Sequence, residues 1–93
     1  MREQEIEQKL REAVRRMGGR AYKFISPGNV GVPDRIVIMP GRQVIFVELK
    51  TEVGRLTPVQ KAQIGYLEGL GQDVRVLYGM NDVEKFIDEL TRS

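Results

Sequence analysis

The sequence contains no cysteine, no histidine and no tryptophan among its 93 residues. Without cysteine the chain can form neither disulfides nor thiolate metal sites. Without histidine it lacks the commonest general base, the imidazole ligands of zinc and any Ser-His-Asp triad. Carboxylates, amines, amides and hydroxyls are therefore the side-chain groups left for catalysis or metal binding.

Long apolar runs are missing as well. No segment approaches the roughly 20 apolar residues of a membrane span, and the N-terminal stretch MREQEIEQKL lacks the apolar core of a signal peptide. Hydrophobic content of 41% and charged content of 30% are typical of a globular protein. We expect one domain over residues 1–93, with a thin core and a cytoplasmic location in a bacterial or phage-infected cell.

Charge is unevenly distributed, although the formal net charge is only +2. Residues 1–61 contain twelve Lys or Arg and seven Asp or Glu, giving +5, whereas residues 62–93 contain three and six, giving −3. A basic first two-thirds favours a polyanion such as nucleic acid as partner, although many soluble domains are similarly asymmetric.

The hydrophobic pattern predicts the order α-β-β-β-α-β-α. Apolar residues recur at helical spacing from Ile6 to Met17, before the stop at Gly18-Gly19. Thr57 and Asn81 are the expected N-caps of the two later helices, each within a capping box. The predicted strands are 20–26, 35–39, 43–50 and 74–78. The later helices lie within 56–71, where Pro58 is the first helical residue and Gly71 follows the end, and within 81–90.

The connections define the fold class. A hairpin-length turn at Pro40-Gly41-Arg42 joins the second and third strands, which makes them antiparallel. The third and fourth strands are joined through a helix, a crossover that makes them parallel. We therefore expect an α/β fold with a mixed four-stranded sheet flanked by helices.

Acidic residues meet at the open end of this hairpin. If the turn is centred on Gly41, the numbers of opposed residues sum to 82, which places Asp34 opposite Glu48. Alternation adds Lys50 to the same face, unless a β-bulge shifts the register. Opposed carboxylates are destabilising unless a positive charge lies between them, and either Lys50 or a divalent cation would supply it.

Carboxylates without histidine or cysteine suit Mg²⁺ or Mn²⁺ rather than zinc. Beside such an ion, Lys50 could hold or deprotonate an attacking water, or stabilise the developing anion. The pattern indicates a phosphodiesterase site. The motif Glu48-x-Lys50 alone is weak evidence for such a site, because charged residues are also common where a strand ends in solvent. The same motif occurs at Glu7-x-Lys9 on a predicted helix.

The stretch SPGNVGVPDRIVIMPGRQVIFVELKTEVGRLTPVQ resembles the virus-type replication-repair nuclease (VRR-NUC) domain, a branch of the PD-(D/E)xK nuclease superfamily. Its motifs are 31–34 (GVPD), 46–50 (FVELK) and 56–60 (LTPVQ), and the likeness runs from the first helix to about Tyr78. The resemblance implies a restriction-endonuclease-like core and Mg²⁺- or Mn²⁺-dependent cleavage of DNA, often branched or flap structures. For a stand-alone member it implies a homodimer akin to Holliday-junction resolvases.

By the same resemblance, Asp34 and Glu48 correspond to the metal-binding carboxylates and Lys50 to the catalytic lysine. The Leu49 carbonyl would be a further metal ligand. Gln60 matches a motif glutamine near the site, and it also completes a capping box that needs no catalytic role.

The family also places a glutamate from the first helix near the metal. Glu7 is favoured because it borders the apolar stripe, Glu3 is the alternative, and Glu5 and Glu12 face the opposite side. Glu7 is equally explained as a surface acid near a helix N-terminus.

Other interpretations concern partners and packing. Residues that could contact DNA, but that also fit an exposed strand, a plain turn or a solvated face, are Lys23, Ser26, Gly28, Asn29, Arg55 and Lys61. Core positions are expected for Tyr22, Phe24, Phe46 and Tyr66. The last helix is one candidate dimer surface, although packing on its own sheet is the simpler role. The rival functions are a non-catalytic DNA-binding module and a nuclease subunit whose partner selects the substrate.

Overall fold

The computed structural model describes residues 2–92, in which three helices accompany one four-stranded sheet. In chain order the elements are α1 (Glu3–Arg16), β1 (Arg20–Lys23), β2 (Arg35–Ile38), β3 (Ile45–Lys50), α2 (Pro58–Gly69), β4 (Asp73–Tyr78) and α3 (Gly79–Arg92). The predicted order of elements is confirmed.

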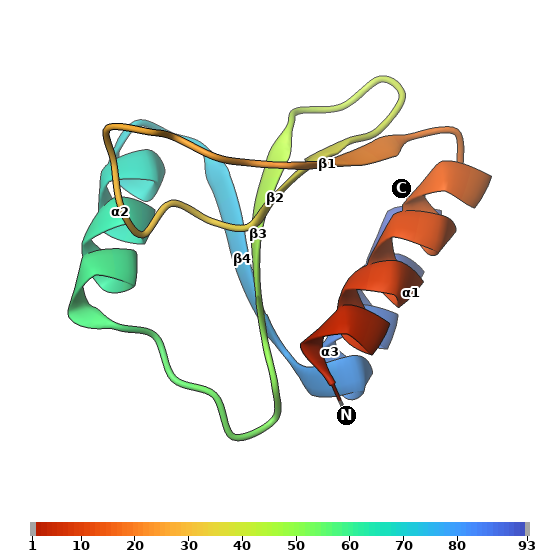
Figure 1. The fold of residues 1–93 in the computed structure, drawn as a ribbon. Helices are drawn as coiled ribbons and strands as arrows, with labels where there is room; N and C mark the ends of the chain where they lie inside the picture. Colours follow the sequence, from red (N-terminus) through yellow and green to blue (C-terminus); the bar gives the residue numbers. More distant parts are fainter. Residues whose placement is uncertain (1, 93) are drawn as a thin grey trace.

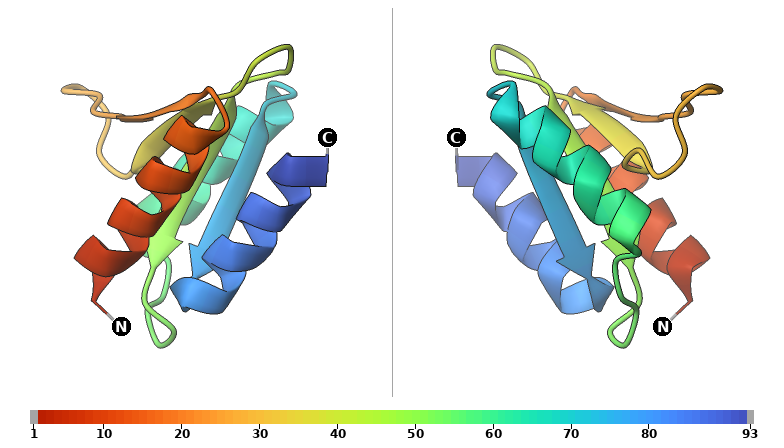
Figure 2. Two further views of the ribbon diagram at one scale, coloured as in Figure 1. Left: turned by 90° about the vertical axis from the view of Figure 1, so that its right-hand side faces the viewer. Right: turned by 90° about the vertical axis from the view of Figure 1, so that its left-hand side faces the viewer.

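The sheet lies between two helical layers. α1 and α3 cover one face side by side, and α2 crosses the other face (Figures 1 and 2). The strand order is β1-β2-β3-β4, in which the first two pairs are antiparallel and β3 and β4 are parallel. The mixed sheet expected from the connections is therefore present.

The hairpin register agrees with the arithmetic from the sequence. Gly41 has a φ of +69° in the turn, and Ile36 lies opposite Phe46, with both neighbouring pairs also summing to 82. β1, β2 and β3 are shorter than predicted, and Asp34 lies one residue before β2. The opposition of Asp34 and Glu48 is thus an extension of the register beyond the paired residues.

The helix ends depend on specific caps. Thr57 caps α2 in a complete capping box with Gln60, as predicted. The predicted cap at Asn81 is wrong, because α3 begins at Gly79. There the Asp82 carboxylate accepts a hydrogen bond from the Tyr78 amide at 2.7 Å. A side chain within the helix thus provides the acceptor for the amide that immediately precedes it.

The core lies between the sheet and the α1–α3 layer. α3 places Val83, Phe86 and Leu90 in it, so this helix packs on its own sheet and leaves no apolar stripe for a dimer. The opposite face has only α2 as cover (Figure 2). Tyr22 on β1 is 57% exposed, and Tyr66, which lies on α2 itself, is 68% exposed, so the expectation that both pack in the core is wrong.

Two aromatic residues do pack on the α2 side. Phe24 and Phe46 are half-buried, and their ring centroids lie 5.7 Å apart. Within residues 2–92, none of the helices is both long and apolar enough to cross a membrane.

Candidate active site

Asp34 is held between the end of β1 and the end of β3. Its backbone carbonyl accepts a hydrogen bond from the Phe24 amide at 2.8 Å. Its side-chain Oδ2 accepts one from the Leu49 amide at 2.9 Å. The carboxylate is therefore fixed against the strand that carries Glu48 and Lys50.

Gly31 sets the distance between this loop and α2. Its φ is +89°, and a Cβ there would lie 2.7 Å from Val59 Cγ1 and 3.1 Å from the Gln60 amide nitrogen. Only glycine fits this conformation and this close approach without strain. The segment before Asp34 consequently lies directly on the first turn of α2, as the path of the chain in Figure 1 also shows.

Gln60 links the helix cap to the carboxylate of Glu48. Its Oε1 accepts a hydrogen bond from the Thr57 amide at 2.9 Å, which is half of the capping box. Its Nε2 donates to Glu48 Oε2 at 3.2 Å. The structural and the site-facing roles of Gln60 are thus combined in one side chain.

Glu48 is a buried carboxylate on β3. It is 2% exposed, and Lys50 Nζ lies 3.4 Å from its Oε2. Its Oε1 is also buried, and no donor within residues 2–92 reaches that atom. Burial above all, and then the negative charge of Asp34, raise the pKa of Glu48 to about 7, against the opposing effect of Lys50.

These groups fit an oxygen-preferring cation. Glu48 presents a buried oxygen without a donor, and Asp34 presents a second carboxylate beside it. In a strand, the N–H and C=O of one residue point toward the same neighbour, so the Leu49 carbonyl faces the Asp34 side of β3. Two carboxylates and a carbonyl are hard donors of the kind that Mg²⁺ binds together with water.

Glu7 stands apart from this pair of carboxylates. It forms an ion pair with Arg35 and lies 3.9 Å from Arg11. Within residues 2–92 no three acidic side chains lie close enough together to form a metal site by themselves. Glu7 and its alternative Glu3 nevertheless line the same small cavity as Asp34, so a role near the metal stays a prediction.

This cavity has a volume of about 160 Å³ and lies between α1 and the ends of β1, β2 and β3. Its lining residues are Glu3, Glu7, Lys23, Asp34, Arg35 and Leu49. Of the predicted DNA contacts, only Lys23 belongs to it. Asn29 and Ser26 close a turn by hydrogen bonds of 2.9 and 3.0 Å, with Gly28 between them, and Arg55 and Lys61 are exposed elsewhere.

Arg35 is the site neighbour that the sequence interpretation missed. It is buried, donates to the Ala21 carbonyl at 3.4 Å and pairs with Glu7. The signal was available, because the register places Arg35 opposite Val47 on the core face, where an arginine requires a partner.

Comparison with known proteins gives the family of the chain. The model of the VRR-NUC domain matches residues 1–81. The chain is 48% identical over 77 residues to "Putative nuclease p44" of Acyrthosiphon pisum secondary endosymbiont phage 1, covering 83% of each chain.

Solved structures give the same result at the level of the fold. A structure described as a VRR_NUC domain has a TM-score of 0.86 and 29% identity, covering 92% of this chain and 94% of its own. The Holliday junction resolvase Hjc of Archaeoglobus fulgidus has a TM-score of 0.58 and 20% identity, covering 82% and 67% of the two chains. The last likeness concerns the PD-(D/E)xK fold alone. Taken with the matched residues, these comparisons show that the chain belongs to the VRR-NUC family of nuclease domains.

Proposed function

We propose that this protein is a divalent-metal-dependent endonuclease that hydrolyses phosphodiester bonds in branched DNA as a homodimer. The observation that carries the proposal is the environment of Glu48. A carboxylate that is 2% exposed, lies beside Asp34 and keeps one oxygen without a donor is costly to maintain for stability alone. A cation between the two carboxylates would remove that cost.

Asp34, Glu48 and the Leu49 carbonyl would hold Mg²⁺ or Mn²⁺, with Glu7 as a further candidate from α1. When bound, such an ion activates water and neutralises charge on a phosphate group. Gln60 holds Glu48 Oε2 by a hydrogen bond of 3.2 Å, whereas the buried Oε1 has no hydrogen-bond partner within residues 2–92.

Lys50 is the proposed catalytic lysine. Its ammonium lies 3.4 Å from Glu48 Oε2 and its side chain is only 16% exposed. Because little solvent reaches this position, the charge of Lys50 can orient an attacking water and stabilise negative charge that develops on the phosphoryl oxygens. Lys23 lines the same cavity as Asp34 and is the proposed contact to a phosphate of the substrate.

Branched DNA and a dimer are supported by the fold and by the surface of α2. The resolvase named above shares the fold, and two cuts in a symmetric junction require two sites related by a twofold axis. α2 exposes Val59 and Tyr66 along one side, and Leu70 follows just beyond its end, 75% exposed. We propose this apolar stripe as the contact with a second copy of the chain, in the cytoplasm of a bacterial or phage-infected cell.

The decisive experiment measures cleavage of a labelled four-way junction beside flap, splayed-arm and plain duplex DNA. Each substrate is incubated with Mg²⁺, Mn²⁺ or EDTA, for wild type, Lys50→Ala and the control Lys85→Ala, an exposed lysine on α3. We expect paired nicks in the junction that disappear with EDTA and with Lys50→Ala but not with the control.

Other outcomes separate the parts of the proposal. Metal-dependent cutting of flaps alone would keep the chemistry and reject the resolvase. Tight binding without cleavage under any metal would favour the binding module or a subunit that needs a partner. Light scattering of Tyr66→Glu tests the dimer surface, because a charge buried in an apolar contact should give a monomer.

A further inference from the structure

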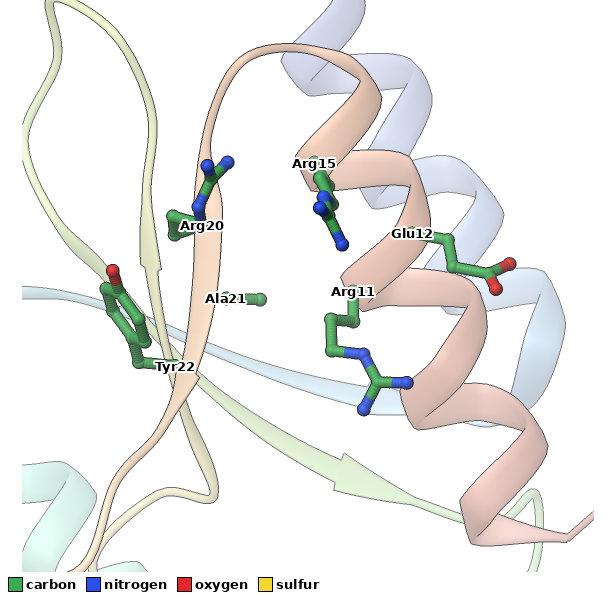
Figure 3. Close-up of a pocket in the computed structure, with 6 residues that line it drawn as sticks. All are labelled: Arg11, Glu12, Arg15, Arg20, Ala21 and Tyr22. Carbon is green, nitrogen blue, oxygen red and sulfur yellow. The ribbon is translucent and has the colours of Figure 1, made fainter.

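A second charged surface lies between α1 and the edge strand β1 (Figure 3). A hollow of about 410 Å³ there is lined by Arg11, Glu12, Arg15, Arg20, Ala21 and Tyr22. We call it the arginine hollow. Neither Asp34 nor Glu48 belongs to it, so it is separate from the candidate active site.

Two arginines of the hollow, Arg15 and Arg20, are available to an external anion, whereas Arg11 lies 3.9 Å from Glu7. Glu12 points away from β1 in Figure 3, accepts a hydrogen bond from Gln8 and lies 3.9 Å from Arg16. Within residues 2–92, Arg15 and Arg20 form no ion pair, and Arg20 donates only to the neighbouring Gly19 carbonyl.

Helix stability explains only part of this arrangement. An arginine in the last turn of a helix complements the helix dipole, which accounts for Arg15. Arg11 lies 3.9 Å from Glu7, one turn earlier, and this i,i+4 pair also stabilises α1. Neither effect accounts for Arg20 on β1. Arg11, Arg15 and Arg20 thus bring positive charge to one hollow from two elements, and arginine is the side chain that most often recognises phosphate.

The arginine hollow and the cavity of Asp34 are both bordered by α1 and β1. Four charged residues of α1, each four positions after the last, form one ridge along the helix: Glu3, Glu7, Arg11 and Arg15. The two acids line the cavity of Asp34, and the two arginines line the hollow. β1 repeats this division, with Lys23 at the cavity and Arg20 at the hollow.

The ridge of α1 gives the distance between the two places. Glu7 and Arg15 are eight residues apart, or about 12 Å along an α-helix. A DNA strand advances about 3.4 Å per nucleotide, so the same length spans roughly three to four nucleotides.

We propose that the arginine hollow binds the phosphodiester backbone of the substrate strand, roughly three to four nucleotides from the bond that is cut. The ligand rests on the proposed function, since the strand is the one held at Asp34 and Glu48. The contacts are made to phosphates, so they carry affinity and position without sequence preference.

The test compares four proteins: wild type, Arg15→Gln/Arg20→Gln, the conservative Arg15→Lys/Arg20→Lys, and the control Lys85→Gln. Binding of a fluorescently labelled DNA duplex is measured by anisotropy in EDTA over a range of KCl concentrations. Losing two phosphate contacts should lower the slope of log Kd against log salt by about 1.8 and weaken binding about tenfold. The lysine variant should keep the slope, and the control should match wild type.

An unchanged slope in the double glutamine variant, with the fold confirmed by circular dichroism, would overturn the proposal. Hydrolysis of bis(p-nitrophenyl) phosphate with Mn²⁺ reports on the active site alone and should be equal in wild type and the double variant. If wild type cleaves nothing but the slope still falls, the arginine hollow stands and the nuclease proposal fails. If wild type cleaves DNA and the slope does not change, only the hollow fails.

Discussion

Asp34 and Leu49 are joined by a side-chain hydrogen bond of 2.9 Å at the point where β2 has not yet begun. The Asp34 carboxylate thus accepts the β3 amide that a backbone carbonyl would accept within the ladder. One residue both secures the end of β3 and offers an oxygen to a cation, and these two roles respond differently to substitution.

Asp34→Asn should keep the first role and lose the second. The asparagine carbonyl can still accept from Leu49, so we expect the metal-free variant to be at least as stable as wild type. Asp34→Ala removes the acceptor and should cost about 1–2 kcal/mol. Both variants should lose cleavage. Urea unfolding in EDTA measures this, and an equal loss of stability in both variants would show that the hydrogen bond is not the cause.

Glu48 makes the metal-free protein less stable as pH rises. Below pH 4.5 its carboxyl is protonated in both states, whereas between 4.5 and about 7 only the folded state keeps the proton. The free energy of unfolding should therefore fall through this window, by up to about 3 kcal/mol. Glu48→Gln should remove this fall and be the more stable protein at pH 8 in EDTA.

The effect of Mg²⁺ on stability is the control for the pH dependence assigned to Glu48. Mg²⁺ should raise the stability of wild type at pH 8 and have a much smaller effect on Glu48→Gln, because only the folded site binds the ion. Unfolding curves at pH 5 and pH 8 that do not distinguish wild type from the variant would contradict the assignment.

Substitutions of Gln60 and Thr57 distinguish the effect of the helix cap on stability from an effect on cleavage. Gln60→Ala and Thr57→Ala each remove half of the capping box and should each cost about 1 kcal/mol. Only Gln60→Ala also removes the donor to Glu48, so it alone should slow cleavage, by about tenfold. Single-turnover rates well below both melting points measure this. Equal rates in the two variants would reduce Gln60 to a cap.

Gly31 and Gly28 form a matched pair within one loop. Gly31→Ala places a Cβ against Val59 at a φ of +89° and should cost about 2–4 kcal/mol. It should also slow cleavage, because Asp34 and Gln60 must separate. At Gly28 a Cβ would meet nothing within 4 Å, so Gly28→Ala should change stability by less than about 0.5 kcal/mol. Thermal melts of the two variants test the difference.

The sequence predicted the hairpin and its charges because the information is local. A turn with glycine at its centre fixes the register by counting, and the pairing of Ile36 with Phe46 followed from Gly41. The capping box at Thr57 likewise depends on four consecutive residues, 57–60. The hairpin brought Asp34, Glu48 and Lys50 together, whereas the place of Gln60 beside Glu48 was expected from the family resemblance alone.

Features that depend on three-dimensional cover could not be predicted in the same way. Tyr66 is 68% exposed although it lies on α2, where Ile64 is the buried residue, and the weakly amphipathic sequence of this helix does not indicate which side meets the sheet. The start of α3 was misplaced because Asp82, inside the helix, satisfies the Tyr78 amide. Arg35 shows a different failure, since its buried position followed from the register but its partner Glu7 lies far away in sequence.

The ridge of α1 that runs from Glu3 to Arg15 is different at its two ends, and this gives each subunit a direction. A polyanion is attracted at the arginine end, while at the acidic end it needs a cation between itself and the protein. A DNA strand is thus expected to lie along α1 with the phosphate that is cut at the acidic end and neighbouring phosphates at the arginine end. Two copies related by a twofold axis would then hold two strands in equivalent positions, as a symmetric junction requires.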